Sequence, residues 1–207
     1  MIFNDYHRTV VGYHGTKLST ARKIINREKS FNPSENSDDW LGHGVYFWEY
    51  APQQAHWWAK RQSAKSNWDE PIAILGSMIR LGFCFDLMDP YNVDEIKQYR
   101  ETAEATGQRV EDNAFHRKYL DCAVFQYAFA AIEAEQDHKV DSARAVYVPA
   151  KPDRVWARSW ISKNAHIQIC VRNQACILGT WLHYPTQLSG DADDDSSKSK
   201  TTEIPIE

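Results

Sequence analysis

The chain has 207 residues, 43% of them hydrophobic, and a net charge of −4. A chain of this size buries enough surface to fold without disulfides or a structural metal, and no run approaches the roughly 18 apolar residues of a membrane span. Residues 191–207 carry six acidic residues and two lysines, so residues 1–190 hold 22 basic and 22 acidic side chains. A neutral body excludes the strong basic field of a dedicated nucleic-acid-binding protein.

The periodicity of apolar residues, together with capping and turn residues, predicts a mixed succession of strands and helices. In the first part of the chain, strands are expected over 8–13, 41–48 and 72–83, and helices over 20–29 and 52–66. In the second part, a helix follows a capping box at Asn92 and Glu95 and ends at Gly107, a longer helix covers 114–136, and strands cover 143–148, 165–172 and 175–183. With no repeat and no linker before residue 188, this order indicates one α+β domain.

The C-terminal end differs from the rest of the chain in composition. It is rich in Asp, Ser and Lys and has almost no large apolar side chain before the last residues. Such a segment cannot bury enough apolar surface to offset its chain entropy. We therefore expect a domain formed by residues 1–188, followed by a disordered acidic tail over 189–207.

The spacing of cysteine and histidine offers one weak alternative, a zinc site. The possible ligands are His166, Cys170, Cys176 and His183. Structural zinc sites place paired ligands about two to four residues apart on tight turns, whereas these residues lie along two predicted strands. We therefore expect buried cysteines in a reducing compartment, and no metal.

Two glycine-containing segments carry residues suited to ligand binding. Residues 12–16, GYHGT, place His14 at a strand end beside Gly15, which lets a ligand approach the backbone. Residues 42–49, GHGVYFWE, place Tyr46 on a strand, where its ring is able to face a planar ligand. Each segment is also compatible with ordinary core packing.

The predicted strand 165–172 has one apolar and one polar face, because successive side chains of a strand alternate between faces. Its apolar face consists of Ile167, Ile169 and Val171. Its polar face consists of His166, Gln168, Cys170 and Arg172. The polar face borders either solvent or a cleft.

Taken together, YHGT at 13–16, GVYF at 44–47 and the late strand with Gln168 resemble the motifs of the NAD-dependent ADP-ribosyltransferase superfamily. The likeness is to its His-Tyr-Glu branch, which includes diphtheria-toxin-like and poly(ADP-ribose) polymerase enzymes. It is closer still to small bacterial members found in toxin–antitoxin or phage-defence settings, and it extends in ordered pieces over about residues 8–184. The resemblance implies an ADP-ribosyltransferase fold with a split antiparallel β-sheet, and NAD as co-substrate.

The resemblance also implies a role for each matching residue. His14, with Thr16 nearby, would bind the adenosine ribose of NAD, and the backbone of Gly15 would grip the nicotinamide carboxamide. Tyr46 would stack on the nicotinamide ring. Trp57, on the following helix, would supply a second aromatic face.

The third motif residue is Gln168, where the family usually has a glutamate that stabilises the cationic transition state as nicotinamide leaves. Glutamine keeps a hydrogen bond to the ribose but lacks a charge worth about 4 kcal/mol at about 4 Å and an effective dielectric near 20. Either Glu49 or Asp39 supplies the carboxylate, or the enzyme is a slow mono-transferase, or catalysis is lost. Elongation to a polymer is not expected.

These considerations predict a mono-ADP-ribosyltransferase acting on a protein or nucleic-acid acceptor; the alternative is a non-catalytic module that binds NAD or ADP-ribose. The loop 149–164 carries Trp156 and Trp160 among cations, and it is either an ordinary exposed loop or the part that contacts the acceptor, with single-strand chemistry if that is RNA or DNA. The first residues do not resemble a signal peptide, so we expect a cytoplasmic protein. An active transferase there would require a cognate antitoxin.

Overall fold

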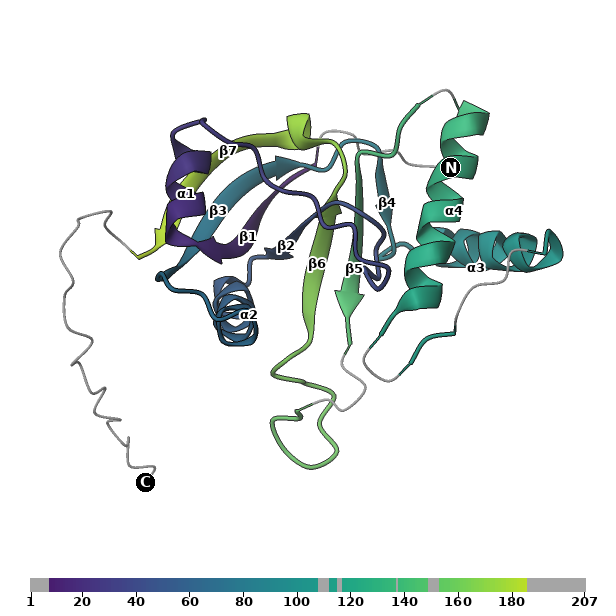
Figure 1. The fold of residues 1–207 in the computed structure, drawn as a ribbon. Coiled ribbons are helices and arrows are strands. Elements are labelled where there is room, and N and C mark those ends of the chain that lie inside the picture. Colours follow the sequence, from purple (N-terminus) through teal and green to yellow (C-terminus); the bar gives the residue numbers. More distant parts are fainter. Residues whose placement is uncertain (1–7, 108–111, 115–116, 137, 149–152, 186–207) are drawn as a thin grey trace.

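The computed structural model describes residues 8–107, 112–114, 117–136, 138–148 and 153–185 (Figure 1). The predicted tail, 189–207, lies outside the described residues. The described part is a mixed α/β structure, in which one seven-stranded open sheet is accompanied by four α-helices. The prediction of a mixed domain with an antiparallel sheet is confirmed at this level.

The sheet has the strand order β4-β5-β6-β2-β1-β3-β7, and every neighbouring pair is antiparallel except β4 with β5. The strands are β1 Thr9–Lys17, β2 Val45–Glu49, β3 Ile72–Arg80, β4 Cys84–Asp86, β5 Ser142–Tyr147, β6 His166–Val171 and β7 Ile177–Tyr184. The helices are α1 Leu18–Ile25, α2 Pro52–Lys65, α3 Pro90–Ala105 and α4 Tyr119–Gln136, with a 3-10 turn at Gln174–Cys176.

The pairing between β1 and β2, in the middle of the sheet, is short. β1 pairs with β3 along its whole length, from Thr9 to Lys17, but with β2 only at Gly12–Glu49 and Tyr13–Trp48. Beyond that point β1 and β2 diverge, and β2 continues along β6. The half formed by β1, β3 and β7 is therefore joined to the half formed by β2, β6, β5 and β4 through a short ladder.

Helices cover the two halves separately (Figure 1). Under α2, the small side chains of Ala55 and Ala59 are buried with Trp48 and Ile74. At the other end of the sheet, α4 buries aromatic side chains such as Phe125 against β4 and β5. A third apolar cluster, which includes Val10, Leu75, Phe47 and Ile169, joins the two halves across the central strands.

Three helices begin at residues other than those predicted, and one of them is the helix expected over 114–136, which is α4 and begins at Tyr119. The helix expected over 20–29 is α1, which begins at Leu18 and ends before Arg27, whose φ of 62° lies in the left-handed region. The capping box at Asn92 and Glu95 is wrong, because α3 begins at Pro90 with Asp89 as its N-cap. The Asp89 carboxylate accepts a hydrogen bond from the backbone N–H of Tyr91 at 3.0 Å.

Strand bounds also differ. The strand expected over 8–13, with His14 at its end, is β1, which continues through His14 to Lys17. The strand expected from residue 41 begins only at Val45, because Gly42 has a φ of 80° and belongs to a turn. The strand expected over 72–83 ends at Arg80, and the short strand β4 after it was not predicted. Its three residues are too few to show a periodicity.

Within the described ranges, none of the helices has the length and apolar character needed to cross a bilayer.

Candidate functional site

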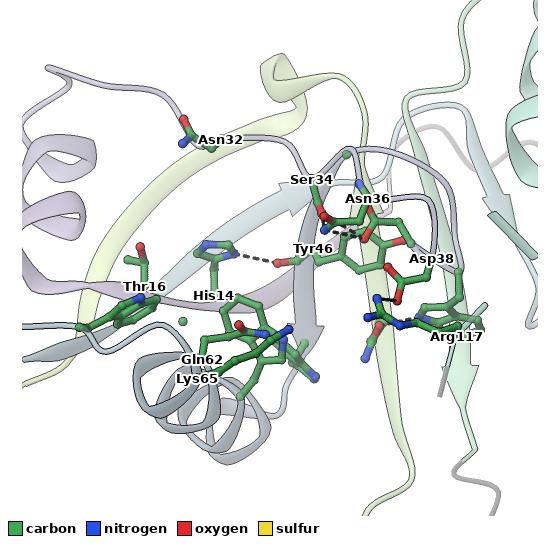
Figure 2. A pocket seen from close by; sticks show the side chains of 18 residues that line it. His14, Thr16, Asn32, Ser34, Asn36, Asp38, Tyr46, Gln62, Lys65 and Arg117 are labelled. Carbon is green, nitrogen blue, oxygen red and sulfur yellow. Dashed lines mark hydrogen bonds and ion pairs between the residues drawn. The ribbon is translucent and has the colours of Figure 1, made fainter. Parts of the chain in front are cut away.

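A cavity opens where β1 and β2 diverge (Figure 2). Its volume is about 630 Å³, within the range of roughly 300–1,000 Å³ that is usual for small-molecule sites. Strands β1, β2 and β6, helix α2 and the segment 32–44 contribute to its wall. The lining residues are His14, Gly15, Thr16, Asn32, Ser34, Asn36, Asp38, Asp39, Trp40, Gly44, Tyr46, Trp48, Trp58, Gln62, Lys65, Trp68, Arg117 and Gln168.

His14 is the residue of β1 that follows the last backbone pair with β2. Its side chain, instead of its backbone, bonds to β2. Its Nδ1 lies 2.9 Å from the carbonyl oxygen of Tyr46. Since a carbonyl only accepts, Nδ1 must carry the proton and donate, which leaves Nε2 as a hydrogen-bond acceptor. Burial lowers the pKa of His14 below its ordinary value, so the imidazole is neutral at pH 7. The ring is held by the edge of Phe31 at 5.3 Å between centroids.

Tyr46 is fixed by its hydroxyl as well as by its ring. The hydroxyl donates to the carbonyl of Gly42 at 2.8 Å and accepts from the backbone N–H of Leu41 at 3.0 Å. Burial raises the pKa of Tyr46, which keeps the phenol neutral. The hydroxyl therefore closes the turn at residues 41–44, and the ring is the part left to the cavity.

Gln168 lies in a chain of three hydrogen bonds in which each residue donates to the next, from Trp40 through Gln168 and His166 to Asn164. The indole N–H of Trp40 donates to Oε1 of Gln168 at 2.7 Å, and Nε2 of Gln168 lies 2.9 Å from Nε2 of His166. Nδ1 of His166 lies 2.9 Å from the carbonyl of Asn164, so this nitrogen donates and the other accepts from the amide. Both amide groups of Gln168 are thus satisfied by the protein.

Aromatic contacts brace the same chain. Tyr147 stacks on His166 with ring centroids 5.1 Å apart, and its edge meets Trp40 at 5.7 Å. Burial lowers the pKa of His166, in keeping with the neutral ring that the hydrogen bonds require. The polar face of the predicted strand 165–172 therefore borders the cavity at Gln168, while Cys170 on the same face is fully buried.

The two carboxylates considered as substitutes for the missing glutamate have different surroundings. Asp39 lines the cavity and accepts hydrogen bonds from Ser34 Oγ at 3.0 Å and from the backbone N–H of Asn36 at 2.9 Å. Burial raises the pKa of Asp39. Glu49 is not among the lining residues, because it forms a buried ion pair with Arg144 at 2.8 Å. The proposal of Glu49 as a substitute carboxylate is therefore wrong.

The tryptophan of α2 that lines the cavity is Trp58, not the predicted Trp57. Trp57 is 58% exposed and does not line the cavity, whereas Trp58 does, with its ring 6.5 Å from that of His14. Trp57 instead lies against the Arg61 guanidinium, 5.6 Å from the ring centroid. Gly15 and Thr16, which the resemblance assigns to NAD binding, also line the cavity.

Gly15 has a second role that the sequence did not reveal. A Cβ at this position would lie 2.6 Å from the carbonyl oxygen of Ala55 and 2.8 Å from the Cβ of Ala59. The glycine therefore lets α2 pack directly on β1. This contact positions the cavity-facing residues of the helix, Trp58, Gln62 and Lys65.

Several other lining residues were not predicted, among them Trp40 and Lys65. Lys65 stands at the end of α2, and no acidic side chain in the described residues pairs with it. Arg117, the other cation of the wall, is paired with Asp38 at 2.9 Å. A single lysine in a polar segment forms no pattern in the sequence. Its place in the cavity wall is therefore seen only in the fold.

The zinc alternative is not supported. Within the part of the chain that the structure describes, no group of three His, Cys, Asp or Glu side chains is arranged to hold a metal ion. Cys170 on β6 and Cys176 in the 3-10 turn are buried as expected, and they belong to different apolar clusters.

The predicted acceptor loop is described only from residue 153 onward, and residues 149–152 lie outside the described residues. Both tryptophans of this loop are exposed, Trp156 at 64% and Trp160 at 97%.

Comparison with known proteins adds no identification: no protein-family model, no curated protein and no solved structure matches this chain.

Proposed function

We propose that this protein binds NAD in the cavity between β1 and β2 and acts as a mono-ADP-ribosyltransferase. The observation that carries the proposal is that His14, Tyr46 and Gln168, selected by motif resemblance from distant parts of the chain, line one cavity. They come from three adjacent strands, β1, β2 and β6. In the ADP-ribosyltransferase fold a split sheet holds these motifs, and the divergence of β1 and β2 is compatible with such a split.

The chemistry of the wall suits a dinucleotide. The free acceptor Nε2 of His14 is able to receive a ribose hydroxyl proton, and the faces of Tyr46 and Trp58 offer stacking surfaces. A diphosphate carries negative charge, and Lys65 is a cation of the wall without an acidic partner among the described residues. A ribose, the nicotinamide ring and the diphosphate of NAD therefore each have a complementary side chain.

In the proposed reaction, the nucleophilic atom of the acceptor bonds to C1′ of the nicotinamide ribose as the C1′–N bond breaks. Nicotinamide leaves with the bonding electron pair as a neutral molecule, and the acceptor loses a proton. Positive charge on the ribose rises in the transition state, so a nearby negative charge accelerates the step. Gln168 is neutral, and Asp39 is the carboxylate of the wall without an ion-pair partner among the described residues. Because the third motif position carries no negative charge, we expect slow turnover.

The second candidate is a module that binds NAD or ADP-ribose without catalysis. The hydrogen-bond chain through Gln168 favours it, because both amide groups already have protein partners. A ligand hydroxyl would have to share or displace the bond from Trp40. The two candidates differ in one measurable product, free nicotinamide.

Calorimetric titration with NAD, followed by chromatographic measurement of nicotinamide release, tests both candidates. We expect NAD to bind, and His14→Ala to lose most of the binding while the control His183→Ala, on β7, retains it. Nicotinamide release above the uncatalysed rate supports the transferase. Binding without release supports the module, and no binding contradicts both.

A further inference from the structure

Two tryptophans project from the loop 153–164, which leads into β6. Trp160 is 97% exposed and Trp156 is 64% exposed. Large aromatic side chains left in water are uncommon on a monomer, and a group of them commonly marks a binding surface. Asn164 ends this loop only a few residues before Gln168, so the tryptophans lie on the element that continues into the wall of the cavity.

The loop is held by its own hydrogen bonds. An antiparallel bridge joins Arg154 to Ser162, and the backbone N–H of Val155 donates to the carbonyl of Ile161 at 3.2 Å. The turn between them is closed by the bond from the N–H of Ser159 to the carbonyl of Trp156 at 3.1 Å. Ordered presentation of exposed rings lowers the entropy cost of binding a partner.

A second exposed tryptophan surface lies on α2. Trp57, Arg61 and Lys65 follow one another at intervals of four residues, so they form one stripe along the helix. Trp57 is 58% exposed and Arg61 lies against its ring, while Lys65 belongs to the cavity wall. The stripe therefore runs from the surface into the cavity.

Both surfaces combine tryptophan with positive charge. The helix contains His56, Lys60, Arg61 and Lys65 and no acidic residue. The loop contains Arg154, Arg158 and Lys163 against the single acidic residue Asp153. Because the body of the protein is neutral as a whole, this excess of cations beside exposed rings is a local feature.

We propose that these two surfaces bind single-stranded nucleic acid, and that this nucleic acid is the acceptor. Single strands are recognised by aromatic rings on which bases stack and by cations that follow the phosphates. A protein partner would suit the tryptophans equally well, but protein interfaces are depleted in lysine. Duplex DNA would not offer its stacked bases to Trp160. The charge of both surfaces therefore favours the single strand.

The role of acceptor rests on the proposed transferase function. A nitrogen or oxygen atom of a base bonds to C1′ of the ribose, the C1′–N bond to nicotinamide breaks, and neutral nicotinamide leaves with the electron pair. The proton of the attacking group passes to solvent. Binding of the strand, in contrast, does not depend on NAD and is measured separately.

The test uses the full chain and fluorescently labelled oligonucleotides of about twelve nucleotides, poly-dT and poly-U, each compared with a duplex of equal length. We expect the single strands to bind, and more weakly as salt rises. Trp160→Ala and Trp57→Ala are each expected to weaken binding about 5- to 150-fold, the range for loss of one stacked base. Tyr91→Ala is the control, because this side chain is also exposed, at 49%, but lies on α3.

The outcomes separate this inference from the proposed function. No binding of single strands, preference for the duplex, or equal affinity in all three variants overturns the inference, even where the unmodified protein binds NAD. If NAD does not bind but strands do, the surface stands and the transferase proposal fails. With labelled NAD and a mixture of the oligonucleotide and cellular protein, label in the oligonucleotide supports the acceptor role, and label in protein alone overturns it.

Discussion

Hydrogen bonds inside the cavity decide which atoms of each side chain are left for a ligand. The bond from His14 Nδ1 to the Tyr46 carbonyl leaves Nε2 as an acceptor. The hydroxyl of Tyr46 is used by the turn at 41–44, so only its ring faces the cavity. Gln168 uses both ends of its amide on Trp40 and His166. The residue types alone therefore do not show which atoms of these three side chains remain for a ligand.

Tyr46→Phe tests the two roles of this residue. The ring remains, so we expect NAD affinity close to that of the unmodified protein. The backbone groups of Leu41 and Gly42 lose their partner, so the free energy of unfolding should fall by about 1–3 kcal/mol. Tyr46→Ala should in addition weaken NAD binding by roughly 1–3 kcal/mol, the range for stacking. Urea unfolding and NAD titration of both variants measure these effects, and equal loss of NAD affinity in both would contradict a stacking role.

Gln168→Glu tests the role of charge at the third motif position. Nδ1 of His166 donates to Asn164, so its Nε2 can donate to a carboxylate only when the ring is protonated. The introduced carboxylate should therefore raise the pKa of His166, which burial lowers in the unmodified protein. Below that raised pKa the imidazolium neutralises the new charge; above it the charge is free to act on the ribose.

Nicotinamide release by Gln168→Glu should consequently increase as pH rises through the pKa of His166. The upper limit is about a thousandfold over the unmodified protein, from about 4 kcal/mol of charge interaction. Proton NMR of the histidine ring gives the pKa, and nicotinamide release is measured over the same pH series. In the double variant Gln168→Glu/His166→Gln the pH dependence should disappear. A flat profile in the single variant would show that Gln168 does not face the reacting ribose.

At the scale of elements, the cavity depends on how closely α2 approaches β1. The helix buries only alanines, Ala55 and Ala59, and packs on the strand at Gly15. Larger side chains at this contact would move Trp58 and Lys65 away from the cavity. The short pairing of β1 with β2 has a similar effect, because it leaves the backbone beyond Tyr13 open and allows His14 to enter the gap.

Gly15→Ala is expected to disrupt this contact. The added methyl group would lie 2.6 Å from a backbone oxygen of α2, which cannot move without the helix. We expect the free energy of unfolding to fall by about 1–3 kcal/mol and NAD affinity to fall with it. Gly179→Ala on β7 is the matched control, because no atom lies within 4 Å of its added Cβ. Thermal unfolding of both variants, with and without NAD, measures these effects. Equal stability of Gly15→Ala and Gly179→Ala would rule out close packing at Gly15.

At the scale of the whole molecule, a buried ion network holds together segments distant in sequence. Arg144 on β5 binds the carboxylate of Glu49 on β2, with an N–O distance of 2.8 Å, and that of Asp86 on β4 at 3.2 Å. Arg8, just before β1, also pairs with Asp86. Hydrogen bonds to Glu49 raise the pKa of Arg144 above its usual value, so the guanidinium is permanently charged.

Arg144→Met should therefore be strongly destabilising. It leaves the carboxylates of Glu49 and Asp86 buried without this partner, for which the usual cost is about 3–5 kcal/mol. The control Arg100→Met removes an exposed pair with Glu104 on α3 and should change the free energy of unfolding by less than about 0.5 kcal/mol. Urea denaturation of the two variants compares them directly; a loss at Arg144 no larger than at Arg100 would mean that the network does not stabilise the fold.

Local physical chemistry was sufficient to predict much of this protein. Pro52 predicted the start of α2, and the alternation of side chains predicted that Gln168 and His166 share a polar face. The resemblance of three short motifs to those of a known family, rather than local chemistry, selected His14, Tyr46 and Gln168, which line one cavity. The helix start and the alternation of side chains depend on neighbouring residues, and so they can be predicted from short stretches of sequence.

Only the tertiary structure decided which partners those residues have. The choice between Trp57 and Trp58 depends on the rotation of α2, and the usual signal failed because the buried face consists of alanines while a tryptophan is exposed. The charge of Glu49 is taken up by Arg144, a residue from a distant strand. Such long-range pairs leave no local pattern, because their geometry exists only after the strands have assembled into one sheet.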